Sequence, residues 1–518
     1  MTRPSFLRKL LFRIAAIAVG LTPLVLIELV LAGLGWGEPN WQDDPFVGFR
    51  GVRPLFVLNQ ARDRYEIPPA RQNYFRPQSF PAAKAADEYR VFCLGGSTVQ
   101  GSPFSTETAF SSWLELALRA ADSQRTWHVI NCGGVSYASY RLIPILQEVL
   151  GYEPDLIIVC TGHNEFLEDR TYQRIKQQPA VLGAVQEWAA GWRTYCLLRA
   201  AYLKCRGSGL QPLAASRPML ETEVDSLLDY RGGLRQYHRD PQWHRDVIRH
   251  YGVNLERMVH LTRQAGVPLL LVTPVSNLRD CPPFKSEHRP DLKPRDLQRW
   301  EQAWNEAKPA YQTDLRAALA CLERAAAIDD QYAGLHYQLG QCYDALGDVE
   351  QARRHYLQAR DLDICPLRML SSMQDVLGEV ADRTGTPLLD ADALIAEQCR
   401  GGIPDDSWLV DHVHPSVRGH QLIADAIAGW MRDEGLVALG ADYEPRREAA
   451  YQAHLAGLGS FYFEEGRRRL EHLHDWARGR ATIVRPTKSN GAPAGRSGAP
   501  SRPDVGVPDV EVPGGRVQ

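Results

Sequence analysis

Short apolar runs alternate with longer amphipathic segments through the middle of this 518-residue chain. Continuous apolar runs of about four to eight residues are typical of strands that helices cover on both faces, whereas apolar residues at every third or fourth position indicate a helix. The order of the two patterns predicts a doubly wound parallel sheet of the α/β class. The predicted strands are 90–94, 127–132, 154–161, 268–273 and 387–390, and the clearest predicted helices are 109–121 and 244–266.

Residues 295–366 interrupt this alternation with a helical, alanine-rich insert. Small and aromatic residues in the insert recur at the spacing of a tetratricopeptide repeat, with a weaker copy 34 residues earlier. A generic amphipathic hairpin is the alternative interpretation. Because about three repeats are needed for a free-standing solenoid, we expect the insert to pack against the α/β domain or a protein partner. The matching positions are Leu339, Gly340, Tyr343, Gly347, Ala352, Tyr356 and Ala359, and in the weaker copy Ala318, Leu322 and Ala325.

Residues 14–36 form a long apolar stretch that holds one charged residue, Glu28. As a helix this stretch would be about 34 Å long, which is enough to cross a bilayer. Basic residues precede it and acidic residues follow it, so residues 1–13 are expected in the cytoplasm and the rest of the chain outside. A cleaved signal peptide is the alternative, but no clear small-residue cleavage site follows the stretch. We therefore expect a single-pass protein of the inner (cytoplasmic) membrane whose main domain is extracytoplasmic.

The remaining segments divide by composition. Residues 89–294 and 367–436 hold the α/β pattern on either side of the insert. Residues 37–88 are rich in Pro, Gln and Arg without a clear period, which indicates an extended juxtamembrane segment. Residues 437–482 predict further helices, and the Pro-, Gly- and Ser-rich residues 483–518 predict a disordered tail.

Charge and cysteine content narrow the class of protein. Lys and Arg number 59 against 62 Asp and Glu, so no basic excess favours nucleic acid as a partner. The ten cysteines are too scattered for a disulfide-stapled scaffold. Three of them lie in predicted strands and are expected in the core, and two pairings stay open for others. The core cysteines are Cys93, Cys132 and Cys160; the open pairings are Cys196 with Cys205, and Cys281 with Cys365 or Cys399.

Polar residues follow several of the predicted strands directly. Ser97 follows the first strand after Gly95 and Gly96, Asn131 to Ser136 end the second, and "TGHNEF" at 161–166 follows the third. The carboxyl ends of parallel strands share one edge of the sheet, where ligands bind in such folds. With "LVDHVHP" at 409–415, this edge would hold a hydroxyl, an amide donor, a carboxylate and an imidazole, the groups that acyl transfer requires.

These residues resemble the four sequence blocks of the SGNH, or GDSL-type, hydrolase superfamily. The blocks are "GGST" with Ser97, "NCGGVSYAS" at 131–139, "GHNE" with Asn164 and "DHVH" with Asp411 and His414. The resemblance covers about 89–278 and 367–435 and implies a flavodoxin-like three-layer fold. More narrowly, "NLRDCPPFKSEHR" at 277–289 and the insert resemble a membrane-anchored bacterial subgroup with tetratricopeptide repeats inside the hydrolase domain.

The resemblance implies a role for each residue. Ser97 is expected to be the nucleophile, with His414 as general base and Asp411 orienting the imidazole. Asn164 and the backbone N–H of Ser97 are expected to donate to the oxyanion. The family usually has a glycine as the remaining donor, and here the position falls on Ser136, with Gly134 as the alternative.

Other polar residues have weaker claims. His412 also neighbours Asp411, but the D-x-x-H-P spacing selects His414; His163 and Lys285 are candidate pocket residues. No metal or cofactor is expected, because the helical histidines lack an i, i+4 pair with a carboxylate base. Those histidines are His238, His244, His250 and His260.

The sequence thus predicts a membrane-tethered serine esterase that acts on an ester, such as an O-acyl group of an envelope glycan or a lipid, in the periplasm. An acyltransferase would use the same residues with a sugar hydroxyl in place of water. A non-catalytic scaffold, in which the insert binds a protein partner, is the third hypothesis. The complete set of serine, amide, carboxylate and imidazole argues against the scaffold.

Overall fold

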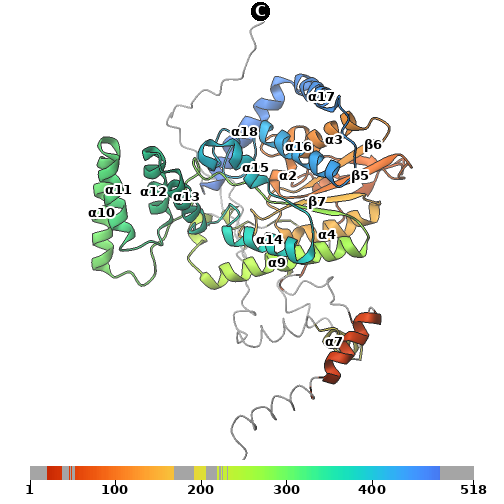
Figure 1. Ribbon diagram of the computed structural model, residues 1–518, viewed down its shortest axis with the longest axis horizontal. Helices are drawn as coiled ribbons and strands as arrows, with labels where there is room; N and C mark the ends of the chain where they lie inside the picture. The colour runs from red at the N-terminus through yellow and green to blue at the C-terminus, as the bar shows by residue number, and fades with distance from the viewer. Residues whose placement is uncertain are drawn as a thin grey trace, which may run out of the picture.

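The computed structural model describes residues 20, 22–34, 36–37, 46, 48–49, 53–168, 192–205, 219–220, 223–224, 226–229 and 232–478. Its centre is a parallel sheet in the strand order β10-β9-β7-β5-β6 (Figure 1). All five predicted strands are present, so the predicted parallel α/β sheet is confirmed. The strands are β5 (Glu88–Gly95), β6 (Thr126–Gly133), β7 (Leu156–Cys160), β9 (Leu269–Val272) and β10 (Leu388–Leu389).

Helices cover both faces of this sheet (Figure 1). Because both faces are covered, the strands are buried throughout, which is why they read as continuous apolar runs. One face packs against α4 (Ser139–Val149), α9 (Pro241–Gln264) and α14 (Ser371–Thr384). The other packs against α3 (Phe110–Ala121), α15 (Ala391–Gln398), α16 (Val417–Asp433) and α17 (Tyr443–Gly457).

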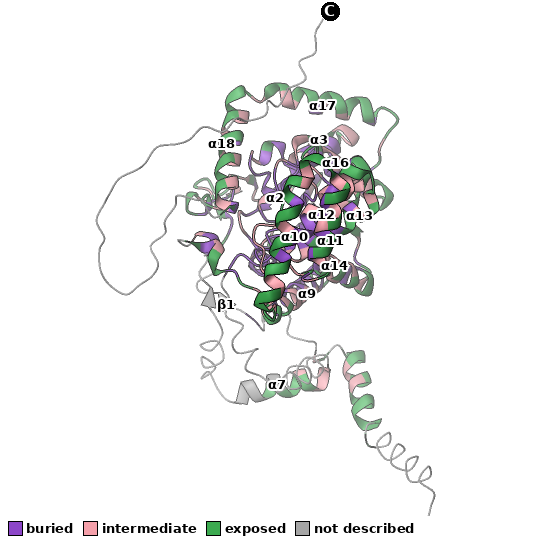
Figure 2. Ribbon diagram, turned by 90° about the vertical axis from the view of Figure 1, so that its left-hand side faces the viewer, coloured by how far each residue is buried: buried purple, intermediate pink, exposed green. Residues whose placement is uncertain are grey.

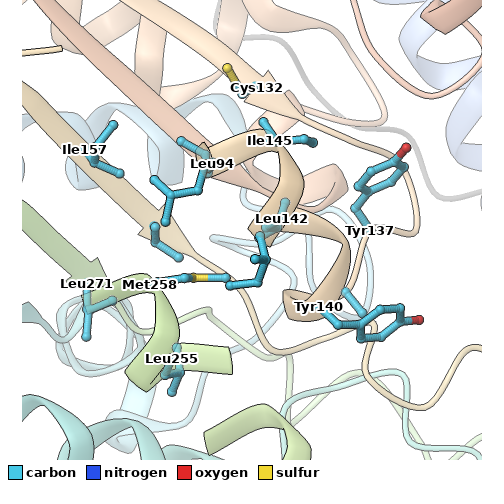
Figure 3. Close-up of a cluster of buried hydrophobic side chains, with 14 of the residues drawn as sticks. Leu94, Cys132, Tyr137, Tyr140, Leu142, Ile145, Ile157, Leu255, Met258 and Leu271 are labelled. Carbon is cyan, nitrogen blue, oxygen red and sulfur yellow. The ribbon is translucent and has the colours of Figure 1, made fainter. Parts of the chain in front are cut away.

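The core between the sheet and α4 and α9 is built from interleaved aliphatic side chains. Figure 3 shows Leu94 and Ile157 from adjacent strands meeting Leu142 of α4 and Met258 of α9. All four are fully buried or nearly so. Burying such a side chain stabilises the fold by about 1.5–3 kcal/mol, so this layer fixes the strands whose ends carry the polar residues.

The insert forms four helices that lie to one side of the α/β body (Figure 1). They pack in sequence as α10 (Pro294–Thr313), α11 (Leu315–Ala326), α12 (Ala333–Leu346) and α13 (Val349–Asp361). At Gly340 a Cβ would lie 2.8 Å from the ring of Tyr356, so a glycine lets α12 and α13 approach closely. The helical insert is therefore present, and its identity as tetratricopeptide repeats stays a prediction.

The segment predicted to be extended, 37–88, contains a small antiparallel sheet in its described part. The strands are β2 (Val57–Leu58), β3 (Arg64–Glu66) and β4 (Ser79–Pro81), and β1 (Gly48–Phe49) pairs in parallel with β8 (Met219–Leu220). Buried Phe56 and Phe80 attach the small sheet to the main core. The aromatic residues of this segment, which have no regular spacing, thus pack against the α/β domain, and the segment is not a loose connection.

The described C-terminal residues are helical, as predicted for 437–482, and end with α18 (Ser460–Ala477). Figure 2 shows α17 and α18 as one angled pair. The tail predicted to be disordered, 483–518, lies outside the described residues. The remaining helices are α2 (Ser97–Gln100), α7 (Arg193–Cys205) and the short 3₁₀ turns Pro69–Arg71, Thr106–Thr108, Leu150–Tyr152, Leu227–Asp229, Gly233–Gln236 and Arg400–Gly402.

Within the described residues, no helix combines the length and apolar character that crossing a membrane requires. Residues 14–19 and 21 of the predicted anchor lie outside the described residues, and 22–34 are helical. The carboxylate of Glu28 accepts hydrogen bonds from the backbone N–H groups of Arg193 (2.9 Å) and Thr194 (2.7 Å) at the start of α7.

The cysteines predicted in the core, Cys93, Cys132 and Cys160, are buried in strands. Cys281, Cys365 and Cys399 are free thiols, so neither of the pairings left open for Cys281 is formed. The pairing of Cys196 with Cys205 stays a prediction, because the side chain of Cys205 lies outside the described residues. Cys281, Cys365 and Cys399 are all buried. A buried cysteine packs as a small apolar residue, so these three residues need no disulfide to explain their position.

Candidate active site

The turn from β5 into α2 places Ser97 at the carboxyl edge of the sheet. A Cβ on Gly95 would lie 2.2 Å from the carbonyl oxygen of Cys160, and one on Gly96 would lie 2.5 Å from Nδ2 of Asn164. Gly96 has φ −85°, a value open to any residue. A side chain at Gly95 would therefore clash with the backbone of β7, and one at Gly96 would displace the amide of Asn164.

The side chain of Ser97 meets that of His414 across 317 residues of sequence. Its Oγ lies 2.8 Å from His414 Nε2, and His414 Nδ1 lies 2.7 Å from Asp411 Oδ2. A carboxylate can only accept, so Nδ1 carries the proton and Nε2 is left to accept the serine proton. This is the tautomer that general-base activation of a hydroxyl requires.

The loop that holds Asp411 and His414 is tightly closed. Asp411 Oδ1 accepts from the backbone N–H groups of Val413 and His414, each at 2.8 Å, and the N–H of Val410 donates to the carbonyl of His414 at 2.9 Å. Burial alone would raise the pKa of Asp411, but His414, His412 and the hydrogen bonds outweigh it and lower that pKa below its ordinary value. Asp411 is therefore ionised and fixed toward the imidazole.

Two residues outside the predicted set hold this loop in place. Asn277 donates from Nδ2 to Asp406 (2.6 Å) and to the carbonyl of Asp411 (3.2 Å). Arg279 donates from Nη1 to Asp405 (2.6 Å) and from Nε to Asp344 of α12 (2.8 Å). The segment "NLRD" thus connects the insert to the loop. The insert therefore borders the loop of Asp411 and His414 on this side.

The structure brings Asn164 to the same edge. Its Nδ2 lies 2.5 Å from where a Cβ on Gly96 would be and donates to the carbonyl of Tyr137 at 3.0 Å, and the residue is partly exposed. An amide Nδ2 has two protons, so one remains for a ligand beside Ser97.

The second candidate backbone donor can be chosen on geometry. The N–H of Gly134 donates to the carbonyl of Gly95 at 3.0 Å, so that group is already engaged. The backbone N–H of Ser136 donates no hydrogen bond to any other described residue. Ser136 has φ +63°, a region that favours glycine. The backbone at Ser136 thus keeps a conformation that suits the glycine usual in the family, although the residue here is serine.

The rival histidines lie close to His414 without taking its place. His412 Nδ1 is 3.6 Å from Asp411 Oδ1, and burial lowers the pKa of His412 to about 4. His163 accepts from the N–H of Met369 at 3.1 Å, and burial holds the pKa of His163 well below its ordinary value. Both imidazole rings are thus neutral at physiological pH. The histidine that contacts Ser97 is His414.

The predicted pocket residue Lys285 is engaged elsewhere. Its Nζ lies 3.0 Å from Glu287 and donates to the carbonyl of Tyr237. Its backbone N–H donates to Asp363 at 3.0 Å, at the end of the insert. These contacts connect the segment before the insert to the last residues of the insert. None of them connects Lys285 to Ser97 or His414.

Among the residues that the structure describes, no cluster of His, Cys, Asp or Glu is arranged to hold a metal ion. The four histidines of the 238–260 region are accordingly not gathered into such a cluster. His244 packs on Phe166 and His250 on Phe46.

Sequence reasoning missed the residues that position the site. Asn277 begins the segment at 277–289 that was noted for its resemblance, and a polar residue four positions after the predicted strand 268–273 was the available signal. Asn131 was grouped with its block, but its function is specific: Nδ2 donates to the carbonyl of Val99 (2.7 Å) and to Ser111 Oγ (2.8 Å). It thereby fastens the end of β6 to the helix that begins with Ser97.

Comparison with known proteins gives a match to one family model. Residues 93–338 match the GDSL-like Lipase/Acylhydrolase family. The matched range includes Ser97 and Asn164 and ends before Asp411 and His414. A comparison with curated protein sequences gives no match.

Several solved structures are similar at low identity. An acetylxylan esterase from Geobacillus stearothermophilus is 13% identical, covering 67% of this chain and 95% of its own, with a TM-score of 0.29. A lipase/acylhydrolase from Enterococcus faecalis is 12% identical, covering 68% and 98%, with a TM-score of 0.30. An α/β hydrolase from the metagenome of Lake Arreo is 13% identical, covering 66% and 94%, with a TM-score of 0.29. Likenesses this distant do not identify a substrate.

The match over residues 93–338 supports a GDSL-like lipase/acylhydrolase domain in this chain, and the protein is an enzyme that hydrolyses ester bonds.

Proposed function

We propose that this enzyme hydrolyses its ester through an acyl-serine intermediate on Ser97. The observation that supports the proposal most is the continuous chain of contacts from Ser97 Oγ to His414 Nε2 (2.8 Å) and from His414 Nδ1 to Asp411 Oδ2 (2.7 Å). His414 takes the proton of the Ser97 hydroxyl as Oγ attacks the ester carbonyl. Asp411 stabilises the imidazolium that forms and holds its ring in place.

The oxyanion of the tetrahedral intermediate accepts from the N–H groups of Ser97 and Ser136 and from Nδ2 of Asn164. As the intermediate collapses, His414 returns the proton to the departing alkoxide, and the acyl group remains on Ser97. A water molecule then attacks the acyl-serine with His414 again as base. The carboxylic acid leaves and the free serine is restored.

The proposed substrate is an O-acyl group of an envelope glycan or a lipid, met outside the cytoplasm. This part of the proposal rests on the predicted anchor at 14–36 and on the charge asymmetry around it. The insert beside the catalytic loop is proposed to bind a protein partner or to limit the size of the substrate.

Replacing Ser97 by alanine removes the nucleophile. We expect Ser97→Ala to abolish labelling by a fluorophosphonate probe and to lower hydrolysis of para-nitrophenyl acetate by at least about a thousandfold. Gel fluorescence and steady-state kinetics measure the two effects. Ser372→Ala, an exposed serine on α14, serves as the matched control and should label normally. Undiminished labelling of folded Ser97→Ala protein would rule out Ser97 as the nucleophile.

Removing the Asn164 amide should slow the reaction without weakening substrate binding. Because one oxyanion donor contributes most in the transition state, Asn164→Ala is expected to lower kcat about 100- to 1,000-fold with little change in KM. Asn305→Ala, an exposed asparagine on α10, is the control. Ser136→Gly keeps the backbone N–H and permits the same φ, so its kcat should stay within about threefold of the wild type. Equal rates for Asn164→Ala and wild type would contradict this role.

The proposed membrane anchor is tested by comparing the full chain with a chain that lacks residues 1–36, both produced in a bacterial host. We expect the full chain to stay in the membrane pellet after alkaline carbonate washing, because a bilayer-spanning helix is not released by loss of charge contacts. The shortened chain should be found in the soluble fraction. Recovery of the full chain in the soluble fraction would contradict the anchor.

A further inference from the structure

Two arginines from distant parts of the chain lie near enough to influence each other electrostatically, and each is attached to a segment that adjoins Ser97 or Ser136. The first, Arg76, lies in the segment that precedes β4. In this segment the carbonyl of Tyr74 accepts from the N–H of Val135 at 2.9 Å and from Nε2 of Gln100 at 2.6 Å. Val135 adjoins Ser136, and Gln100 ends the helix that begins with Ser97. The backbone two residues before Arg76 is thus bonded to the residue before Ser136 and to the last residue of the helix that begins with Ser97.

The second arginine, Arg469, lies on α18. Its Nε donates to the carbonyl of Pro103 at 2.8 Å. Pro103 follows Ser102, whose N–H donates to the carbonyl of Ser97 at 3.0 Å. Arg469 is therefore attached to the loop that leaves the nucleophile helix.

Helix α18 is held across this edge at both ends. Near its start, Gly466 packs on Phe104 so closely that a Cβ would lie 2.1 Å from the ring. Near its end, Trp476 donates to Asp229 at 2.9 Å. The helix is therefore a fixed element, and its arginine has a defined position.

Neither arginine has an anionic partner within the described part of the chain. No carboxylate lies within the 4.0 Å of an ion pair from Arg76 or Arg469, and Nε of Arg76 is buried without an acceptor. Burial and the neighbouring Arg469 together lower the pKa of Arg76, while Glu107 and Tyr462 act in the opposite direction. Glu107 is exposed and too far for an ion pair. By contrast, Arg279 at the other side of the site has two carboxylate partners.

We propose that Arg76 and Arg469 form a binding subsite for an anionic group, a carboxylate or a phosphate, on the ester substrate. The inference rests on the proposed function and adds the substrate's charge to it. Two adjacent guanidinium groups repel each other unless an anion lies between them, and their planar donors match carboxylate and phosphate oxygens. The buried donor of Arg76 without an acceptor is the group that such an anion would satisfy.

Matched esters with and without an anionic group test the subsite in the full-length enzyme. For the alcohol half, the probes are para-acetoxybenzoate, para-acetoxyphenyl phosphate and neutral methyl para-acetoxybenzoate. For the acyl half, they are the para-nitrophenyl adipate monoanion and neutral para-nitrophenyl heptanoate. We expect wild-type kcat/KM to be higher for the charged member of at least one set. The set that shows the preference tells which half of the ester faces the arginines and whether carboxylate or phosphate is preferred.

The variants Arg76→Gln and Arg469→Gln should each lower the ratio of charged to neutral kcat/KM by about tenfold or more, the typical effect of losing a hydrogen bond to a charged group. Arg467→Gln, an exposed arginine on the same helix, removes the same charge and should leave the ratio unchanged. In the wild type, added salt should reduce the ratio as well, which tests the subsite without any substitution.

A wild type that prefers the neutral ester in every set would overturn the subsite, as would equal ratios in Arg76→Gln and Arg467→Gln. Both results leave the esterase intact, since the neutral esters are still hydrolysed. Failure of the proposed function looks different: no ester of any charge is hydrolysed and Ser97 takes no fluorophosphonate label.

Discussion

The site depends on how closely the chain can approach itself at the end of β5. Gly95 stands opposite Gly133 of β6 and Cys160 of β7 in the sheet register, and no Cβ fits at Gly95 or Gly96. The parallel register fixes three strand ends at one level, and the glycines let Ser97 and Asn164 approach each other across that edge. A larger residue there would separate the proposed nucleophile from its proposed oxyanion donor.

His414 lies 317 residues after Ser97 in the sequence, so its imidazole is held at this edge by contacts other than those of the strand ends. Asp411 closes the loop through two backbone N–H groups, and Asn277 and Arg279 fasten the loop from outside. Because Arg279 also binds Asp344 of α12, the insert and the catalytic loop share one residue. This connection gives a physical reason for placing the insert between β9 and α14.

The sequence predicted the strands, their parallel class and the residues that meet at the edge, because buried strands and the blocks after them leave strong local patterns. Ser97, Asn164, Asp411 and His414 were each named, and the structure brings them together. The contacts that position them could not be predicted, since Arg279 pairs with Asp344 and Asp405 through distances set only by tertiary packing. The small sheet within 37–88 was missed because its strands are two or three residues long. Lys285 was chosen from its place after a strand, and local sequence does not report that Glu287 engages it.

The central claim is that His414, held by Asp411, makes the hydroxyl of Ser97 the acyl acceptor. Rapid acid quenching during the first turnover of a slowly deacylating ester, para-nitrophenyl pivalate, followed by mass spectrometry of the peptides, tests it directly. The account predicts one pivaloyl group on the peptide that contains Ser97, formed at the rate of nitrophenol release and absent in His414→Ala. A pivaloyl group on another residue, or its undiminished formation on Ser97 in His414→Ala, would contradict the account.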